Sequence, residues 1–420
     1  MGRMAATVRT ARVAVLLAAL ATFTLACLFG PGGLLTSWHA PDVGYYAQLG
    51  RRMVAGQIPY RTLYVEYPPG ALPIFLLPAV SQSHYVELFK VLMAICGALT
   101  LGVVAWTAAL QRRSPAGTAL ALTPVAVAPV VLGSVFLNRY DPWPALLAAL
   151  GLALLLAGRS RGAAAALALS ALAKIFAIAA VPIAAASTLR RRGRASLRRA
   201  VIAFAAVLAV VLVPFAALGP GGLRFSFTVQ LTRHLEVESL GASLLLAADR
   251  LGLYHATIVS GTPGSRDLAG ALPTAVGVLS TLLELAAIVV VWLVYVRGRD
   301  EPGRLVAAFA AAVVAYVAFG KVLSPQYVVW LLPLVPLVRG RRGLVATGLL
   351  LGAMALTRIE FARFGSLNHV GPVVWVLLAR YAVLVGLFAL LVARLAPVPL
   401  ARRREVDVEP VRAHESIAEP

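Results

Sequence analysis

The sequence predicts an all-α polytopic membrane protein, and three observations lead to that prediction. Only 13% of the 420 residues are charged, about half the share that a soluble domain carries. Several apolar runs reach or approach the ~20 residues that cross a bilayer. Arginine-rich runs separate many of them, and the mean hydropathy of the chain is +0.86.

The strong positive charge fits the same class. A net charge of +21 would suggest nucleic-acid binding in a soluble protein. Here the positive residues lie in short runs between apolar segments, as the positive-inside rule produces, so we do not expect a nucleic-acid partner. Cys27 and Cys96 lie inside apolar runs and fit neither a metal pair nor an obvious disulfide, which predicts two small core residues.

About ten to thirteen transmembrane helices fit the sequence, and the preferred threading has about twelve crossings. Their approximate ranges are 12–29, 85–110, 116–137, 143–157, 162–173, 175–188, 199–219, 271–296, 305–320, 326–338, 344–357 and 372–394.

Residues 162–189 are ambiguous. Arg159 and Arg161 precede this apolar stretch, and the run "RRRGRASLRR" (190–199) follows it. Both flanks favour the cytoplasm, so an even number of crossings should lie between them. We therefore expect two short helices with Lys174 at the far tip, because broken helices are tolerated where they line a cavity. A single long, tilted helix is the alternative.

This threading places both termini in the cytoplasm. Residues 1–400 form one transmembrane domain, and residues 401–420 form a charged, disordered cytoplasmic tail. Two outer segments are long, about 30–84 and 220–270. Neither is large enough to be a separate domain of ordinary size, so we expect short juxtamembrane helices that cap the bundle.

Polar residues gather at the predicted outer ends of the helices and suggest one mixed-charge cavity there. Cations suit a phosphate, whereas carboxylates and tyrosines suit hydroxyl groups. The residues are Asp42, Tyr45, Glu66, Tyr67, Arg139, Asp141, Lys174, Arg233, His234, Glu236, Glu238, Lys321, Gln326, Arg358 and Glu360.

This inventory fits sugar transfer from a lipid phosphate. The leaving group is already a stable anion, so no general acid is needed, and one carboxylate suffices as base for the acceptor hydroxyl. Fixed positive charge stabilises the departing phosphate. The sequence has no Gly-rich nucleotide loop and no His-Glu-x-x-His metal motif, so no cofactor and no metal are expected.

Five segments together resemble glycosyltransferase family 87, of the GT-C fold, and its actinobacterial relatives. They span most of the chain in order: "DVGYY…GQIPY…EYPPGALP" (42–73), "NRYDPWPALLAALGLALL" (138–155), "ALAKIFAIAAVP" (171–182), "RHLEVESLGASL" (233–244) and "KVLSPQYVVWLLPL" (321–334). The resemblance implies a GT-C-like bundle, a polyprenyl-phosphate sugar donor with mannose expected, and inverting transfer to an acceptor outside the membrane. It also implies an acidic catalytic base in the first outer loop, which is Asp42 here.

We thus expect Asp42 to be catalytic and a further set of residues to bind substrate and phosphate: Glu66, Tyr67, Arg139, Asp141, Lys174, Arg233, His234, Glu238, Lys321 and Gln326. Simpler roles remain open for several of them. Asp42 could cap a helix, Arg139 and Asp141 could pair with each other at the surface, and Lys174 could reach lipid phosphates.

The sequence hypothesis is a hexosyltransferase of the bacterial plasma membrane with its active site on the extracytoplasmic face. Its partners would be a polyprenyl-phosphate sugar, an envelope glycolipid or glycan acceptor, and membrane lipids. The alternatives are a transporter or flippase of lipid-linked sugars, or an inactive relative that serves as a scaffold. A transporter would place polar residues along the midplane, whereas only Glu284 and Arg380 are predicted to lie deep in the membrane.

Overall fold

The computed structural model describes residues 2–37, 41–261, 265–363 and 371–395. Within these ranges, seven helices are long and apolar enough to cross a membrane, which confirms an all-α polytopic membrane protein. They are α1 (Gly2–Phe29), α4 (Tyr85–Leu110), α9 (Val181–Leu218), α12 (Ala271–Arg297), α13 (Pro302–Phe319), α14 (Gly340–Ala362) and α15 (Val373–Leu395). The predicted tail, 401–420, lies outside the described residues.

Shorter apolar helices complete the bundle. They are η1 (Pro69–Ala71), α3 (Leu72–Leu76), η2 (Leu77–Val80), α5 (Pro115–Val131), α7 (Pro142–Leu156), α8 (Ser160–Ala173), η3 (Ile175–Ala180), η4 (Pro325–Leu331) and η5 (Val335–Leu337). Every predicted crossing falls on a long or short apolar helix. Most of the short pieces have proline in their first turn, where its missing backbone donor is not needed, and this proline stops the preceding piece from continuing through it. Such breaks are tolerated at membrane depth where protein surrounds them.

Helix α13 forms the centre of the bundle. From Leu305 to Ala315, no residue of α13 is more than 1% exposed, and the helix packs against α12, α15, η3 and η4. Its many alanines let neighbouring backbones approach closely. Outer helices instead expose large apolar side chains, such as Val210 at 75% and Leu279 at 63%. In a soluble protein such patches would be a liability, so these faces contact lipid.

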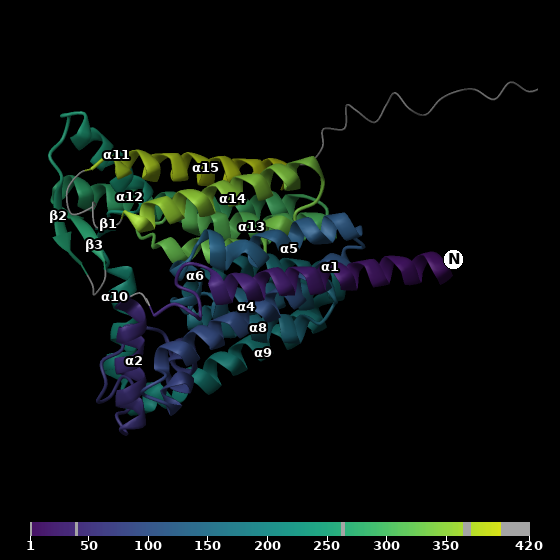
Figure 1. Ribbon diagram of the computed structural model, residues 1–420, viewed down its shortest axis with the longest axis horizontal. Helices are drawn as coiled ribbons and strands as arrows, with labels where there is room; N and C mark the ends of the chain where they lie inside the picture. Colours follow the sequence, from purple (N-terminus) through teal and green to yellow (C-terminus); the bar gives the residue numbers. More distant parts are fainter. Residues whose placement is uncertain (1, 38–40, 262–264, 364–370, 396–420) are drawn as a thin grey trace, which may run out of the picture.

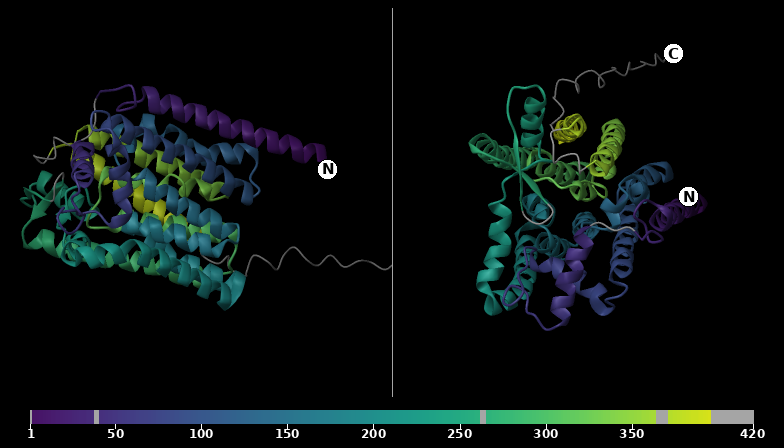
Figure 2. Two further views of the ribbon diagram at one scale, coloured as in Figure 1. Left: turned by 90° about the horizontal axis from the view of Figure 1, so that it is seen from below. Right: turned by 60° about the vertical axis from the view of Figure 1, so that its left-hand side comes forward.

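The helices run side by side, and the remaining elements gather at one end (Figure 1). These elements are α2 (Pro41–Val54), α10 (Pro220–Leu231), α11 (Leu240–Arg250) and strands β1 (Leu235–Glu236), β2 (Thr257–Ser260) and β3 (Arg266–Ala269). We call this the α2 end; it comes forward in the right-hand view of Figure 2. Helix α1 begins and α15 ends at the opposite end.

The helix that was ambiguous in the sequence breaks at Lys174. The backbone of Lys174 is extended (φ −159°, ψ 129°), so α8 ends at the preceding residue. The chain then returns through η3 and α9, which packs along α8 and brings Arg192 back beside Gly158, just before α8 begins. The hairpin interpretation is therefore confirmed. A second break follows at Gly193, whose φ of 74° is a conformation that glycine adopts without strain.

Segment 220–270, for which only short helices were expected, also contains β-strands. Besides the helices α10 and α11 it contains a small antiparallel sheet in the order β1-β3-β2, with Leu235 opposite Leu268 and Ile258 opposite Leu268 on the other side. Strands of two to four residues are too short for an alternating pattern to stand out in a sequence. The sheet packs through β1 and β3 on α12 and fixes the position of Glu236 and Asp267.

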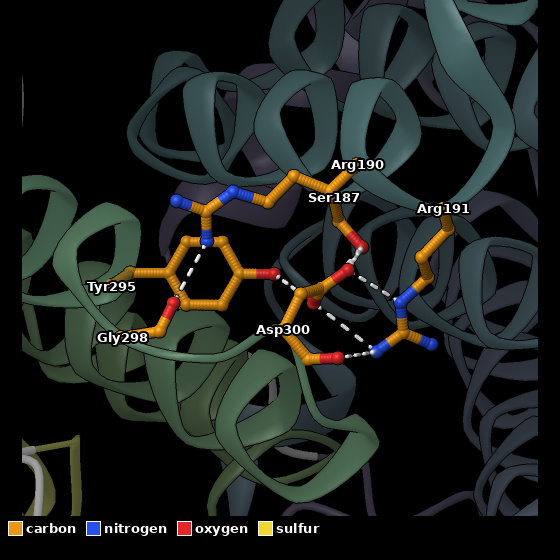
Figure 3. Close-up of polar contacts among 6 residues, drawn as sticks. All are labelled: Ser187, Arg190, Arg191, Tyr295, Gly298 and Asp300. Atoms are coloured by element: carbon orange, nitrogen blue, oxygen red, sulfur yellow. Dashed lines mark hydrogen bonds and ion pairs between the residues drawn. The ribbon is translucent and has the colours of Figure 1, made fainter.

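At the opposite end, Asp300 clamps α9 to the connection between α12 and α13 (Figure 3). Its carboxylate accepts hydrogen bonds from Arg191 Nε at 2.6 Å, Tyr295 Oη at 2.6 Å and Ser187 Oγ at 3.2 Å. Arg190 donates to the carbonyl of Gly298 at 3.0 Å. Two arginines of the run at 190–199 thus hold helices together.

The first prediction concerns this clamp. Asp300→Ala leaves the buried Tyr295 hydroxyl and the Arg191 guanidinium without their acceptor, so we expect a loss of about 1–3 kcal/mol in the free energy of unfolding. Unfolding in detergent measures it. Glu301→Ala removes the same charge from the next residue, which is exposed, and is the matched control. Equal losses in the two variants would contradict the clamp.

The clamp also predicts a pH dependence. Burial alone would raise the pKa of Asp300, but hydrogen bonds from Arg191 and Tyr295 bring it below its ordinary value. Such a carboxylate stabilises the fold above its unfolded pKa of about 4 and ceases to do so as the pH falls through the folded pKa. The stability difference between wild type and Asp300→Ala should therefore be constant near neutral pH and shrink below about pH 4. A difference that does not change with pH would contradict the ionic role.

Candidate functional site

Asp42 and Arg139 form an ion pair at the α2 end of the bundle. Asp42 lies in the first turn of α2, where a negative charge suits the positive end of the helix. Arg139 follows the one-turn helix α6 (Ser134–Leu137) and is buried, whereas the Asp42 side chain is 29% exposed. Arg139 Nε also donates to Gln326 Oε1 at 3.4 Å. The three predicted residues thus connect α2, the start of α7 and η4.

Asp141 and Lys174 form a second ion pair, at the start of α7 and the end of α8. Lys174 Nζ lies 2.8 Å from Asp141 Oδ1, and the indole nitrogen of Trp330 donates to the same oxygen at 2.8 Å. The Asp141 side chain is fully buried. Rings of Tyr140, Tyr327 and Trp330 surround the ammonium at 4.8–5.1 Å, within the range of a cation–π contact. Asp141 therefore pairs with Lys174 and not, as one alternative had it, with Arg139 at the surface.

An aromatic layer joins the first outer segment to this pair. Tyr46 stacks on Phe75 with ring centroids 4.5 Å apart, and Tyr67 meets Tyr140 edge to face at 5.5 Å. Tyr67 also accepts a hydrogen bond from the Tyr60 hydroxyl at its backbone oxygen, at 2.6 Å. The tyrosines of residues 42–70 thus pack mainly against rings of the bundle, such as Phe75 and Tyr140, and fix the position of the loop that carries Asp42 and Glu66.

Glu66 is buried and lies close enough to Asp42 for the two carboxyl groups to interact. Burial raises the pKa of Glu66, and the negative charge of Asp42 acts in the same direction, whereas Arg233 opposes both. Asp42 has no acidic neighbour in the sequence before Glu66. The fold therefore supplies one from the far side of the same loop.

A third group of charges lies around the small sheet. Arg233 pairs with Glu236 at 3.3 Å, and its charge also reaches Asp267. Burial raises the pKa of Glu236 to about 7 in spite of the neighbouring Arg233. Glu236 Oε2 and Asp267 Oδ1 are buried and have no hydrogen-bond partner in the described part of the chain. These oxygens are acceptors for which the described protein supplies no donor.

Glu238 anchors its loop to the last two helices instead of joining the other predicted residues directly. Its carbonyl accepts hydrogen bonds from Arg380 and from the Tyr381 hydroxyl, both at 2.9 Å. Arg380 also pairs with Glu360 at 3.2 Å, and all three charged side chains are buried. Burial and the nearby Glu360 carboxyl group raise the pKa of Glu238 well above its ordinary value.

Two predicted residues lie at the margin. His234 is exposed beside Arg233. A positive charge on its ring favours the ionised form of Asp267. Lys321 donates to the carbonyl of Leu231 at 2.8 Å, and its own carbonyl accepts from the Glu236 amide. Lys321 thus ties the start of the η4 segment to the sheet, and it does not contact Lys174.

Sequence reasoning missed Asp267, Trp330 and Tyr140 as members of the cluster. Asp267 lies on a four-residue strand, and its approach to Glu236 follows from the pairing of β1 with β3. Trp330 looked like one more apolar residue of a membrane helix. Its indole donor was the available signal, because a buried Trp usually has a hydrogen-bond acceptor nearby. Among the described residues, no group of three or more His, Cys, Asp or Glu side chains is placed to hold a metal ion.

Comparison with known proteins identifies one family. Residues 64–325, well over half of the chain, match the model of glycosyltransferase family 87. No curated protein shows significant similarity to this sequence. The matched range contains Glu66, Arg139, Lys174 and the small sheet, begins after Asp42, and ends just before Gln326.

The second prediction concerns Lys174. Lys174→Met leaves the Asp141 carboxylate buried without its cation, and we expect a loss of about 3–5 kcal/mol in the free energy of unfolding. Lys321→Met is the matched control, because the hydrogen bond of the Lys321 ammonium is exposed and Lys321 has no ion pair among the described residues. Unfolding in detergent compares the two.

A double-mutant cycle then separates pairing from packing. Asp141→Asn should cost much less in the Lys174→Met background than in the wild type. Additive losses would show that the two side chains do not stabilise the fold as a pair.

Proposed function

This chain belongs to glycosyltransferase family 87 and is a membrane glycosyltransferase, and on that basis we propose that it transfers a hexosyl residue, with mannosyl expected, from a polyprenyl phosphate. The acceptor is an envelope glycolipid or glycan. The observation that carries the proposal is the composition of the α2 end. There, the partly exposed carboxylate of Asp42 pairs with Arg139, and buried carboxylate oxygens of the same end lack hydrogen-bond donors among the described residues.

The chemistry requires one base and one cation. An acceptor hydroxyl attacks the anomeric carbon of the donor and gives its proton to Asp42. The bond between that carbon and the phosphate oxygen breaks, and polyprenyl phosphate leaves as an anion. The Arg139 guanidinium, already 10% exposed beside Asp42, provides positive charge where the negative charge develops.

Asp42 fits the role of base better than the other acids of the cluster. Asp141 is fully buried and neutralised by Lys174. Glu238 is buried, and its loop is tied to the last two helices. Glu66 is the second candidate, because it lies near Asp42 but is less exposed.

Buried acceptors support a sugar as the ligand. Asp141 Oδ2, Glu236 Oε2 and Asp267 Oδ1 have no hydrogen-bond donor among the described residues, and a buried acceptor without a donor is costly. Sugar hydroxyl groups are donors of the required kind. Arg233, Lys321 and Lys174 complete the proposed phosphate and sugar contacts; Lys174 is the least available of them because Asp141 already binds it.

The proposed orientation places the α2 end on the extracytoplasmic face of a bacterial plasma membrane, with both termini in the cytoplasm. The arginine runs at 190–199 and 339–342 support it, since positive residues remain on the cytoplasmic side.

The third prediction tests the base. Asp42→Asn keeps the shape of the side chain and a good helix-capping group but removes the base, so we expect the turnover of mannose from synthetic polyprenyl-phosphate mannose to fall by about 10²–10⁴-fold. Radiolabel incorporated into extracted membrane lipids measures it. Glu87→Gln is the matched control, because Glu87 is an exposed acid in the first turn of α4.

The outcomes separate the candidates. Full activity in Asp42→Asn with loss in Glu66→Gln would move the role of base to Glu66. Full activity in both variants would contradict a carboxylate base at this site. If the wild type transfers no label from this donor, the proposed donor class is wrong.

A further inference from the structure

A cavity of about 360 Å³ lies at the end of the bundle opposite the α2 end. It is lined by Gly158, Arg159, Ser160, Arg161, Gly162, Arg192, Ser196 and Arg199, from the turn between α7 and α8 and from the kinked part of α9. Helix α7 starts at the Asp141 pair and runs for 15 residues, about 22 Å, before it reaches this turn. The cavity is therefore separate from the site proposed for sugar transfer.

The lining combines four guanidinium groups with two hydroxyl groups and no acid. In the described part of the chain, no carboxylate pairs with any of the four arginines; Asp300, the nearest acid to the run at 190–199, binds Arg191 instead. Arg199 donates only to the Ala195 carbonyl and to Ser196 Oγ, both at 3.3 Å. Four positive charges thus converge on a space large enough for a small ligand.

Two glycines shape this space. Gly158 has a φ of 74°, and a side chain there would occupy the place of the Arg192 guanidinium. The absence of a side chain at Gly158 therefore lets the Arg192 guanidinium approach the backbone of the turn. Gly193 then breaks the helix, so that Ser196 and Arg199 face the same space from the second half of α9. The backbone thus brings the arginines together.

The surroundings identify the source of the ligand. Directly after Arg199, α9 continues with lipid-facing residues, among them Val201 at 56% and Ile202 at 59% exposure. The cavity thus lies where the phosphate groups of a bilayer meet its hydrocarbon. Arginine binds phosphate oxygens through two parallel hydrogen bonds, and basic pockets between membrane helices suit anionic head groups.

We propose that this cavity binds the head group of an anionic phospholipid, whose phosphate oxygens accept hydrogen bonds from Arg159, Arg161, Arg192 and Arg199. The acyl chains lie along the exposed apolar face of α9 that begins at Val201. The bound lipid joins the turn between α7 and α8 to both halves of α9. It therefore stabilises the hairpin whose other end carries Lys174.

The test reconstitutes the full chain in phosphatidylcholine nanodiscs that contain increasing amounts of cardiolipin or phosphatidylglycerol. Lipid retained after extraction is counted by native mass spectrometry, and the unfolding midpoint is measured in parallel, because a ligand that binds the folded state raises it. We expect the anionic lipids to be retained and to raise the midpoint, whereas phosphatidylcholine alone does neither.

Matched variants separate a built pocket from a generally positive surface. Arg161→Gln/Arg192→Gln removes two lining arginines and should weaken retention by about fivefold for each arginine removed. Arg194→Gln/Arg198→Gln removes two exposed arginines of the same helix that do not line the cavity and should lose less. The single variants Arg161→Gln and Arg192→Gln give graded losses even if the double variant unfolds.

Two results would overturn the proposal. Equal losses in the lining and control variants would show that the positive surface as a whole attracts lipid. Stabilisation by pyrophosphate in phosphatidylcholine nanodiscs, together with displacement of the retained anionic lipid by pyrophosphate in the mixed nanodiscs, would assign the cavity to a soluble phosphate.

Discussion

The rest of the structure depends on the buried ion pair between Asp141 and Lys174. Each residue lies at a break in the chain, Asp141 at the start of α7 and Lys174 between α8 and η3. Trp330, from η4, donates to the same carboxylate. A single oxygen atom therefore holds three interrupted helices in one place. A buried carboxylate is costly unless it is paired and hydrogen-bonded, so this position strongly favours one arrangement of the three segments.

These breaks have a functional consequence. A continuous helix satisfies its own backbone groups. Continuous helices in place of the short ones would not end beside each other, so Arg139 and Gln326 would lie apart. Short helices that stop beside the Asp141 pair instead place Arg139, Gln326 and Asp42 together at the α2 end. Stacked rings of Phe176 and Tyr327 on Trp330 fill the space behind them. The aromatic layer from Tyr46 to Tyr140 then holds the loop with Asp42 and Glu66 over this support.

Much of the fold could be predicted from the sequence because a bilayer imposes simple length and charge rules. Apolar runs between arginine clusters marked every helix that crosses the bundle, and Lys174 marked the hairpin, since a lone cation between apolar helices requires a local reason. The small sheet could not be predicted, because its strands have two to four residues. The pairing of Asp141 with Lys174 instead of Arg139 also depends on tertiary packing, because Asp141 and Lys174 are 33 residues apart in the sequence.

The proposed use of a lipid-linked donor requires that the α2 end, with Asp42 and Arg139, faces away from the cytoplasm. Labelling of single cysteines by a membrane-impermeant maleimide tests this in intact cells. Gln48 on α2 and Arg299 at the opposite end are exposed, whereas the native Cys27 and Cys96 are buried. The account predicts that Gln48→Cys is labelled in intact cells and that Arg299→Cys is labelled only after permeabilisation. The reverse pattern would place the site in the cytoplasm and contradict an extracytoplasmic active site.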